Sequence, residues 1–305
     1  QVRDIYAGQI TNWSEVGGGD RPIRLFAREE VDAAWVQFTQ TVMRRRAASQ
    51  EIERLESDRE LSTQIASEEG AIGIIPFAFI GSNRAVNLTA SCGIEFEASE
   101  FGIKTEDYPL SRRNTLLLSP RAGENPQEFA RFASASSAFE IVRDAGYVSM
   151  APVLGSREYT TFRLLDATRA APAAPDARYA EAMLQYNIAT RGALRLSTTF
   201  RFVAGSAQLD ARGIEDIERV AEFLRQPENA RYRVRVLGFT DAGGAFGQNR
   251  AISERRAGEV GGLLRQRGIQ IAQARGLGPI APVACDDDPD AAVRNRRVEI
   301  WLSTR

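Results

Sequence analysis

The strongest constraint on the fold is an alternation of strand and helix patterns in the last third of the chain. Residues 194–203 and 231–237 alternate apolar and polar side chains with a period of two, as a strand buried on one face does. Residues 214–224 and 248–267 have the apolar spacing of amphipathic helices, and 297–303 returns to a strand pattern. This order predicts a β-α-β-α-β-β domain over residues 191–305, a sheet with helices on one face.

The first half of the chain also mixes helix and strand patterns. The apolar run 71–79 fits a buried strand, and residues 126–136 and 137–145 read as helices. Small residues and two prolines at 170–175 are typical of a linker. We therefore predict an α/β domain over 1–160, a linker with a short helix over 161–190, and an α+β domain over 191–305.

Composition removes several classes of chemistry. The chain has no histidine, which excludes Ser-His-Asp and Cys-His catalysis and imidazole metal sites. Lys104 follows no glycine-rich loop, so no P-loop is present. Ser14 and Ser253 lack a base partner. The acidic run Asp286–Asp288 with Asp290 lacks the glycine and the distal glutamate of an EF-hand, which favours a solvated turn over a calcium site. We expect no catalytic residues, no metal and no cofactor.

Charge is distributed unevenly between the two halves. Residues 190–305 carry 19 arginines against 14 acidic residues, a net charge of +5, whereas residues 1–189 carry −6. A basic domain can favour an anionic polymer. The arginines follow no single helix face, so we expect no nucleic-acid partner. No apolar run approaches the roughly 18 residues that span a membrane, so we expect no transmembrane segment.

Two motifs near the C-terminus carry the most specific signal. Residues 238–257 contain Thr240-Asp241 and then Asn249-Arg250-Ala251-Ile252-Ser253-Glu254-Arg255-Arg256-Ala257, and residues 295–299 read Asn-Arg-Arg-Val-Glu. Together they resemble the OmpA-like peptidoglycan-binding domain. Taken without the motif, Asp241 and Arg256 would be interpreted as a surface salt bridge.

The resemblance implies a site for the diamino acid of the peptidoglycan stem peptide. That diamino acid has a free carboxylate and a free ammonium, which an arginine fork and an aspartate match. Asp241 and Arg256 are then the binding pair, and Thr240 and Asn249 line or brace the site. At most one of Arg296 and Arg297 is expected to reach the ligand, because neighbouring strand residues face opposite ways.

Three ordered motifs in the first half resemble phosphate-type periplasmic substrate-binding proteins. They are Ile5-Tyr6-Ala7-Gly8-Gln9-Ile10-Thr11-Asn12-Trp13, Gly70-Ala71-Ile72-Gly73-Ile74 and Tyr108-Pro109-Leu110-Ser111-Arg112. That family's fold has two lobes, and its first lobe begins well before the motif at which this chain starts. The resemblance therefore implies a partial two-lobed domain, with the first lobe largely missing.

The stretch that binds the oxyanion in that family differs here. Asp32-Ala33-Ala34 stands where the family has Ser-Gly-Thr at the start of a helix. Free N–H groups and the helix dipole stabilise an anion at such a place, whereas a carboxylate repels it. We therefore expect no tight phosphate binding, and a small anion or a protein partner of this domain is left open.

Two cysteines, Cys92 and Cys285, lie far apart in the sequence. Both resemblances point to the periplasm or cell envelope of a Gram-negative bacterium, where disulfides persist. A bridge between the two expected domains and two unpaired thiols both remain open.

Three functions are compared. The leading hypothesis is a non-enzymatic envelope protein that binds peptidoglycan through its C-terminal domain and displays a substrate-binding-protein-like domain in the periplasm. The alternative is a solute receptor for phosphate or another anion, anchored to the wall and serving a transport or sensing system. A cell-wall enzyme would need a catalytic pair, and the sequence shows none.

Overall fold

A computed structural model describes residues 1–44, 46–170, 176–203 and 205–304. The chain divides into two compact units, each made of two segments. Unit 1 comprises Gln1–Val86 and Arg112–Ser149, and unit 2 comprises Asn87–Ser111 and Met150–Arg305. The chain therefore passes between the units three times. No helix among the described residues is both long and apolar enough to cross a membrane.

Unit 1 is built on a small parallel sheet with strand order β2-β1-β3. Its strands are β1 (Arg24–Ala27), β2 (Glu53–Arg54) and β3 (Ala71–Gly73). The expected strand 71–79 ends at Gly73, and a 3-10 turn, η3 (Phe77–Phe79), follows Pro76. The remaining helical elements are α1 (Val2–Tyr6), η1 (Trp13–Val16), α2 (Ala33–Phe38), η2 (Thr39–Met43), α3 (Asp58–Ser67), α5 (Glu124–Ser134), η4 (Ser136–Ala138) and α6 (Phe139–Asp144).

Unit 2 contains a four-stranded mixed sheet with strand order β6-β9-β7-β8. The strands are β6 (Ala193–Phe200), β7 (Tyr232–Phe239), β8 (Ile271–Gly278) and β9 (Arg297–Thr304). β7 and β8 are parallel, and β9 is antiparallel to both β6 and β7. With α9 (Ala211–Arg225) and α10 (Phe246–Gln266) between them, the predicted β-α-β-α-β-β order is confirmed.

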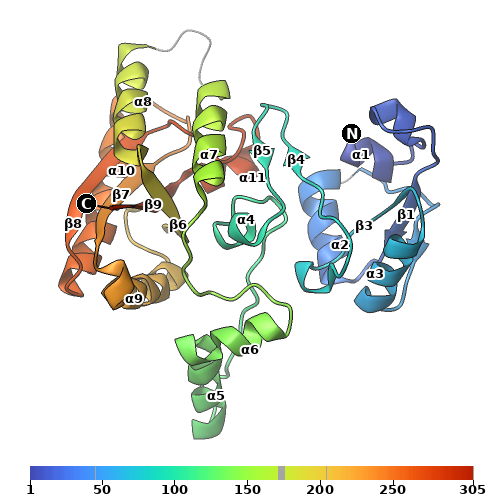
Figure 1. Cartoon of the computed structure of the whole chain (residues 1–305), viewed down its shortest axis with the longest axis horizontal. Helices are drawn as coiled ribbons and strands as arrows, with labels where there is room; N and C mark the ends of the chain where they lie inside the picture. Colours follow the sequence, from blue (N-terminus) through green and yellow to red (C-terminus); the bar gives the residue numbers. More distant parts are fainter. Residues whose placement is uncertain (45, 171–175, 204, 305) are drawn as a thin grey trace. The chain divides into compact units, whose positions relative to one another are not determined.

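The two long helices within 191–305, α9 and α10, share one face of this sheet as expected, and two further helices that precede residue 191 cover the other face. One face packs against α9 and α10 through Ile217, Val220 and Val260. The other packs against α7 (Arg157–Arg169) and α8 (Ala177–Thr190), where Tyr186 meets Phe239 and Trp301. Figure 1 shows α7 and α8 on the side of the sheet opposite α9.

The segment between the expected domains is not a simple linker. α7 and α8 occupy most of residues 161–190 and belong to unit 2. Of the small-residue run expected as a linker, Ala170 is the C-cap of α7, and residues 171–175 lie outside the described residues.

The segment 87–111 belongs to unit 2 and not to the expected first domain. It forms the hairpin β4 (Leu88–Thr89) and β5 (Glu95–Phe96), followed by α4 (Glu100–Lys104). The physical reasons for this placement are a disulfide and a buried ion pair to the body of unit 2, both described below. Unit 2 is completed by η5 (Pro227–Asn229), α11 (Pro289–Ala292) and η6 (Val293–Asn295).

Two strand glycines allow α10 to lie close to the sheet. A Cβ at Gly238 would stand 2.3 Å from the Ser253 carbonyl oxygen, and one at Gly276 would stand 2.1 Å from the Glu254 nitrogen. Among the helix glycines, Gly261 faces Ala274, whereas Gly262 faces open space. The close approach therefore depends mainly on the strands, and it sets the distance between the sheet and α10, which carries Asn249 and Arg256.

Candidate functional site

The candidate site lies where β7 ends and α10 begins. Asp241 follows β7, and its carboxylate accepts from the Gly243 nitrogen at 3.2 Å and pairs with the Arg296 guanidinium. Asn249, in the first turns of α10, is buried and donates from Nδ2 to the Gly243 carbonyl at 2.8 Å. Asn249 thus braces the loop that carries Asp241, one of the two roles expected for it.

Among the described residues, Arg256 forms neither an ion pair nor a hydrogen bond with Asp241. Its Nε and Nη2 both donate to the Ser206 carbonyl, at 3.1 and 2.9 Å, and its guanidinium lies 4.9 Å from the Phe202 ring centroid. Burial lowers the pKa of Arg256, Arg296 lowers it further, and Asp241 acts in the opposite direction. The three charges therefore form one electrostatic group although only Asp241 and Arg296 touch. Nη1 of Arg256 makes no hydrogen bond to any described residue.

Arg296 and Arg297 have separate roles because they face opposite ways. The Arg296 side chain is 42 % exposed and meets Asp241. Arg297 is fully buried, donates to Glu299 at 2.7 Å and to the Ala281 carbonyl at 2.8 Å, and stacks over Phe239. Arg297 is therefore a core residue and is removed from the candidate binding set.

Thr240 is buried and directly precedes Asp241 in the chain. Its nitrogen donates to the Gly278 carbonyl at 3.0 Å, which continues the β7–β8 pairing. Its hydroxyl is buried and has no hydrogen-bond partner among the described residues. A buried, unpaired hydroxyl of this kind costs about 1–3 kcal/mol.

Asp286 and Asn295, for which the sequence predicted no role in binding, connect the two loops of the site. Asn295 is fully buried, and its Oδ1 accepts from the Val283 and Ala284 nitrogens at 2.7 and 3.0 Å. Asp286 Oδ1 accepts from Asn295 Nδ2 at 3.0 Å and from the Ala242 nitrogen at 3.1 Å. Asn295 opens the Asn-Arg-Arg-Val-Glu motif, which was a usable signal, whereas nothing distinguishes Asp286 within its acidic run.

Cys92 and Cys285 form a disulfide with Cα atoms 5.8 Å apart. Both residues lie in unit 2. The bridge therefore does not link the two compact units, as a bridge between the expected domains would. It ties the segment 87–111 to the loop that precedes β9.

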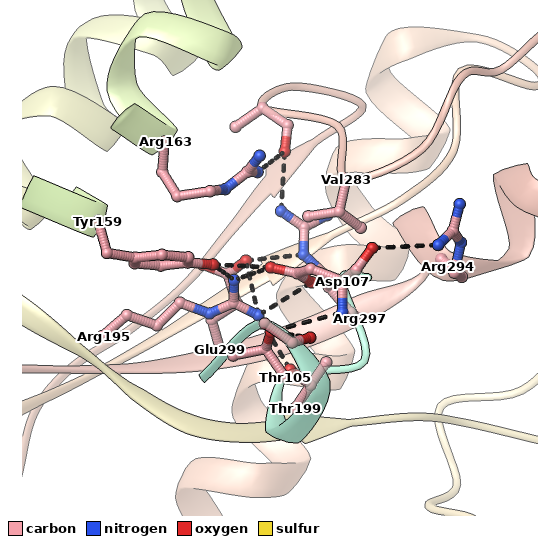
Figure 2. A network of polar contacts seen from close by, with 12 residues as sticks. Thr105, Asp107, Tyr159, Arg163, Arg195, Thr199, Val283, Arg294, Arg297 and Glu299 are labelled. Atoms are coloured by element: carbon pink, nitrogen blue, oxygen red, sulfur yellow. Dashed lines mark hydrogen bonds and ion pairs between the residues drawn. The ribbon is translucent and has the colours of Figure 1, made fainter. Parts of the chain in front are cut away.

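A buried polar network fixes the same segment from a second side (Figure 2). Arg195 on β6 donates to Asp107 at 2.5 Å, to the Tyr159 hydroxyl at 2.8 Å and to Thr199 at 2.9 Å, and it lies 3.6 Å from Glu299. Burial by itself raises the pKa of Asp107, but the nearby guanidinium groups of Arg195 and Arg163 outweigh it and hold the pKa well below its usual range.

The cavity beside this network is too small for a substrate. It measures about 10 Å³, and Phe96, Asp107, Tyr159 and Arg163 contribute to its lining. That volume holds about one water molecule. No described group of three or more His, Cys, Asp or Glu side chains could hold a metal ion.

In unit 1 a carboxylate fills the place expected for an anion. Asp32 caps α2, and its Oδ1 accepts from the Ala34 and Trp35 nitrogens at 2.8 and 3.2 Å. Asp58 lies 3.7 Å from Arg28. Burial and Asp32 raise the pKa of Asp58, and Arg28 partly offsets them.

Comparisons with known proteins match the two halves of the chain separately. The OmpA family model matches residues 201–296, and a model described as a PBP superfamily domain matches residues 1–136. The chain is 34 % identical to the probable lipoprotein YiaD of Escherichia coli over 113 residues, which are 36 % of this chain and 50 % of that protein. It is 34 % identical to the peptidoglycan-associated lipoprotein of Pseudomonas putida over 116 residues, which are 37 % of this chain and 68 % of that protein.

A third relative matches the first half. The phosphate-binding protein PstS of Bacillus subtilis is 24 % identical over 159 residues, which are 52 % of this chain and 52 % of that protein. The chain thus spans about half the length of YiaD and of PstS.

Proposed function

The chain belongs to the OmpA family through residues 201–296, and from this we propose that unit 2 binds peptidoglycan at Asp241, Arg256 and Arg296. The observation that carries the proposal is one carboxylate and two guanidinium groups at the end of β7, held by buried Asn249 and by the close approach of α10. The relatives named for peptidoglycan association support it.

The geometry suits an amino acid that bears both charges. The ammonium of the stem-peptide diamino acid binds Asp241, which already accepts from one cation. Its carboxylate binds the Arg256 edge that carries Nη1, since the other edge is held by the Ser206 carbonyl. Arg296 is half-exposed and adds positive charge beside the carboxylate of the diamino acid.

Unit 1 and the first half of the chain supply the second part of the proposal. The match to the PBP superfamily over residues 1–136 supports a substrate-binding-protein-like domain. We propose that this domain is displayed in the periplasm of a Gram-negative bacterium. We propose no enzymatic activity, in keeping with relatives named for binding and association. The solute-receptor alternative is supported by the PstS match, whereas Asp32 opposes phosphate as the solute.

Binding of the whole chain to purified peptidoglycan sacculi tests the proposal. Asp241→Ala and Arg256→Ala should each weaken binding by about tenfold or more, because each leaves a ligand charge unpaired in a partly buried site. Arg233→Ala and Glu228→Ala, at exposed positions of the same unit, are matched controls and should bind normally. Binding that survives both site substitutions would rule out this site. Circular dichroism of each variant separates lost binding from lost folding.

A further inference from the structure

One carboxylate oxygen joins the two loops that carry the charges of the proposed site. Asp286 Oδ1 accepts from the Ala242 nitrogen and from Asn295 Nδ2, at 3.1 and 3.0 Å. Ala242 follows Asp241 directly, and Asn295 precedes Arg296 directly. Asp286 thus fixes the neighbours of the two residues whose ion pair lies in the site.

Asp286 is itself held from two directions. Asn295 fixes the backbone just before Asp286, because its Oδ1 accepts from the nitrogens of Val283 and Ala284. On the other side the disulfide fixes Cys285, and the Cys92 nitrogen donates to Cys285 Sγ at 3.3 Å. The segment 87–111 is anchored in turn by the pair of Asp107 and Arg195.

We propose that Asp286 is a positioning residue for the peptidoglycan site and that the Cys92–Cys285 disulfide holds it in place. Asp286 aligns the loop of Asp241 with that of Arg296, and it acts through the Ala242 nitrogen without touching the ligand. The inference rests on the proposed function of the same site.

The disulfide is necessary to this role because Asp286 is exposed. An exposed carboxylate free to move exchanges its hydrogen bonds with water at little cost. A backbone fixed one residue away removes much of that freedom, and pre-organised groups lose less entropy when a ligand binds. The effects of removing Asp286 and of removing the bridge should therefore overlap.

The test uses the whole chain and a soluble stem peptide that ends in the diamino acid, with dissociation constants from calorimetry. Asp286→Ala should weaken binding about three- to tenfold, the loss expected for one or two hydrogen bonds. Asp286→Asn keeps the acceptor oxygen and should bind within about twofold of the unchanged chain. Asp287→Ala removes the neighbouring carboxylate, which contacts Ser91, and should also bind normally.

The bridge is tested in the same assay. The Cys92→Ser/Cys285→Ser chain should bind as weakly as Asp286→Ala, and the chain with all three substitutions should be no weaker than either. The amide resonance of Ala242 should shift in all three variants and return close to its original position in Asp286→Asn.

Several outcomes would overturn the inference. Normal binding by Asp286→Ala would show that the hydrogen bonds of Asp286 to Ala242 and Asn295 have no role in binding. Equal losses in Asp286→Asn and Asp286→Ala would show that the charge acts on the ligand directly. If the fold-loss of affinity in the triple variant equals the product of the losses in Asp286→Ala and in Cys92→Ser/Cys285→Ser, the bridge and the carboxylate act separately. Asp241→Ala separates a failure of the proposed site from a failure of the role of Asp286. If both Asp286→Ala and Asp241→Ala bind normally, the proposed site is wrong. If Asp241→Ala loses binding and Asp286→Ala does not, only the role of Asp286 is wrong.

Discussion

Arg195 donates from Nη1 to Asp107 Oδ2 at 2.5 Å, and both side chains are buried. Asp107 lies in the part of the chain that matches the PBP superfamily, and Arg195 lies on β6, just before the OmpA match begins. The ion pair therefore joins a segment that matches the PBP superfamily to a strand that lies outside both family matches, and it does so inside one compact unit.

The first prediction concerns this ion pair. Asp107→Ala should lower the free energy of unfolding by about 3–5 kcal/mol, because it leaves the buried charge of Arg195 without its main partner. Asp144→Ala, at an exposed position of unit 1, is the charge-matched control and should change stability by less than about 0.5 kcal/mol. Urea unfolding of both variants measures the difference.

The same pair fixes the direction of a pH dependence. The folded pKa of Asp107 lies below its ordinary value of about 3.9, so the unfolded chain takes up this proton first as pH falls. The stabilisation by Asp107 is complete above about pH 5 and is lost as pH falls toward the folded pKa. Melting temperature measured from pH 7 to pH 3 should fall less steeply in Asp107→Asn. Parallel curves would contradict this origin.

The second prediction concerns phosphate. Because the Asp32 carboxylate already accepts from the Ala34 and Trp35 nitrogens, the chain should show no micromolar phosphate binding by calorimetry at neutral pH. Asp32→Ser removes the repelling charge and is the matched comparison. Tight binding by the unchanged chain would refute the prediction, and binding by Asp32→Ser alone would identify the carboxylate as the cause.

The third prediction concerns the thiols. The denatured, unreduced chain should contain no reactive thiol, and the reduced chain should contain two. The bridge spans 193 residues, for which loop entropy predicts a stabilisation of about 5 kcal/mol. Two labelled thiols before reduction would mean that the bridge is absent.

The fourth prediction concerns the approach of α10 to the sheet. Gly276→Ala should destabilise unit 2 by about 1–3 kcal/mol and weaken peptidoglycan binding, since its Cβ would meet α10 at Glu254 and Ser253. Gly262→Ala places the same methyl group in open space within the helix and should stabilise by up to about 1 kcal/mol. Equal effects of the two substitutions would show that the close approach is unimportant.

Local patterns were sufficient for most elements of the last third of the chain, although none located β8 (Ile271–Gly278). The alternation at 231–237 and the helical spacing of 248–267 correspond to β7 and α10. A short helix was expected within 161–190, but its packing on the second face of the sheet was not. α8 packs through tyrosines and alanines, such as Tyr186 and Ala182, and their pattern does not specify which sheet face they cover.

Contacts between distant residues could not be predicted from spacing. Asp241 and Arg256 were expected to form one ligand-binding pair, but the contact of Arg256 with the Ser206 carbonyl could not be expected, because backbone groups leave no sequence signature. Asp107 and Arg195 are 88 positions apart and lie in different expected domains. The cysteine pairing stayed open for the same reason, since a bridge depends on the distance between Cα atoms.

The interleaved order of segments has a consequence for proteolysis. A single cut between residues 149 and 150 leaves residues 1–149 joined to 150–305 through Cys92 and Cys285, so the two pieces separate on a gel only after reduction. Complete shedding of unit 1 requires three cleavages, after Val86, Ser111 and Ser149, where domains joined end to end would need one. A protease that attacks this chain once therefore nicks it without releasing unit 1 from unit 2.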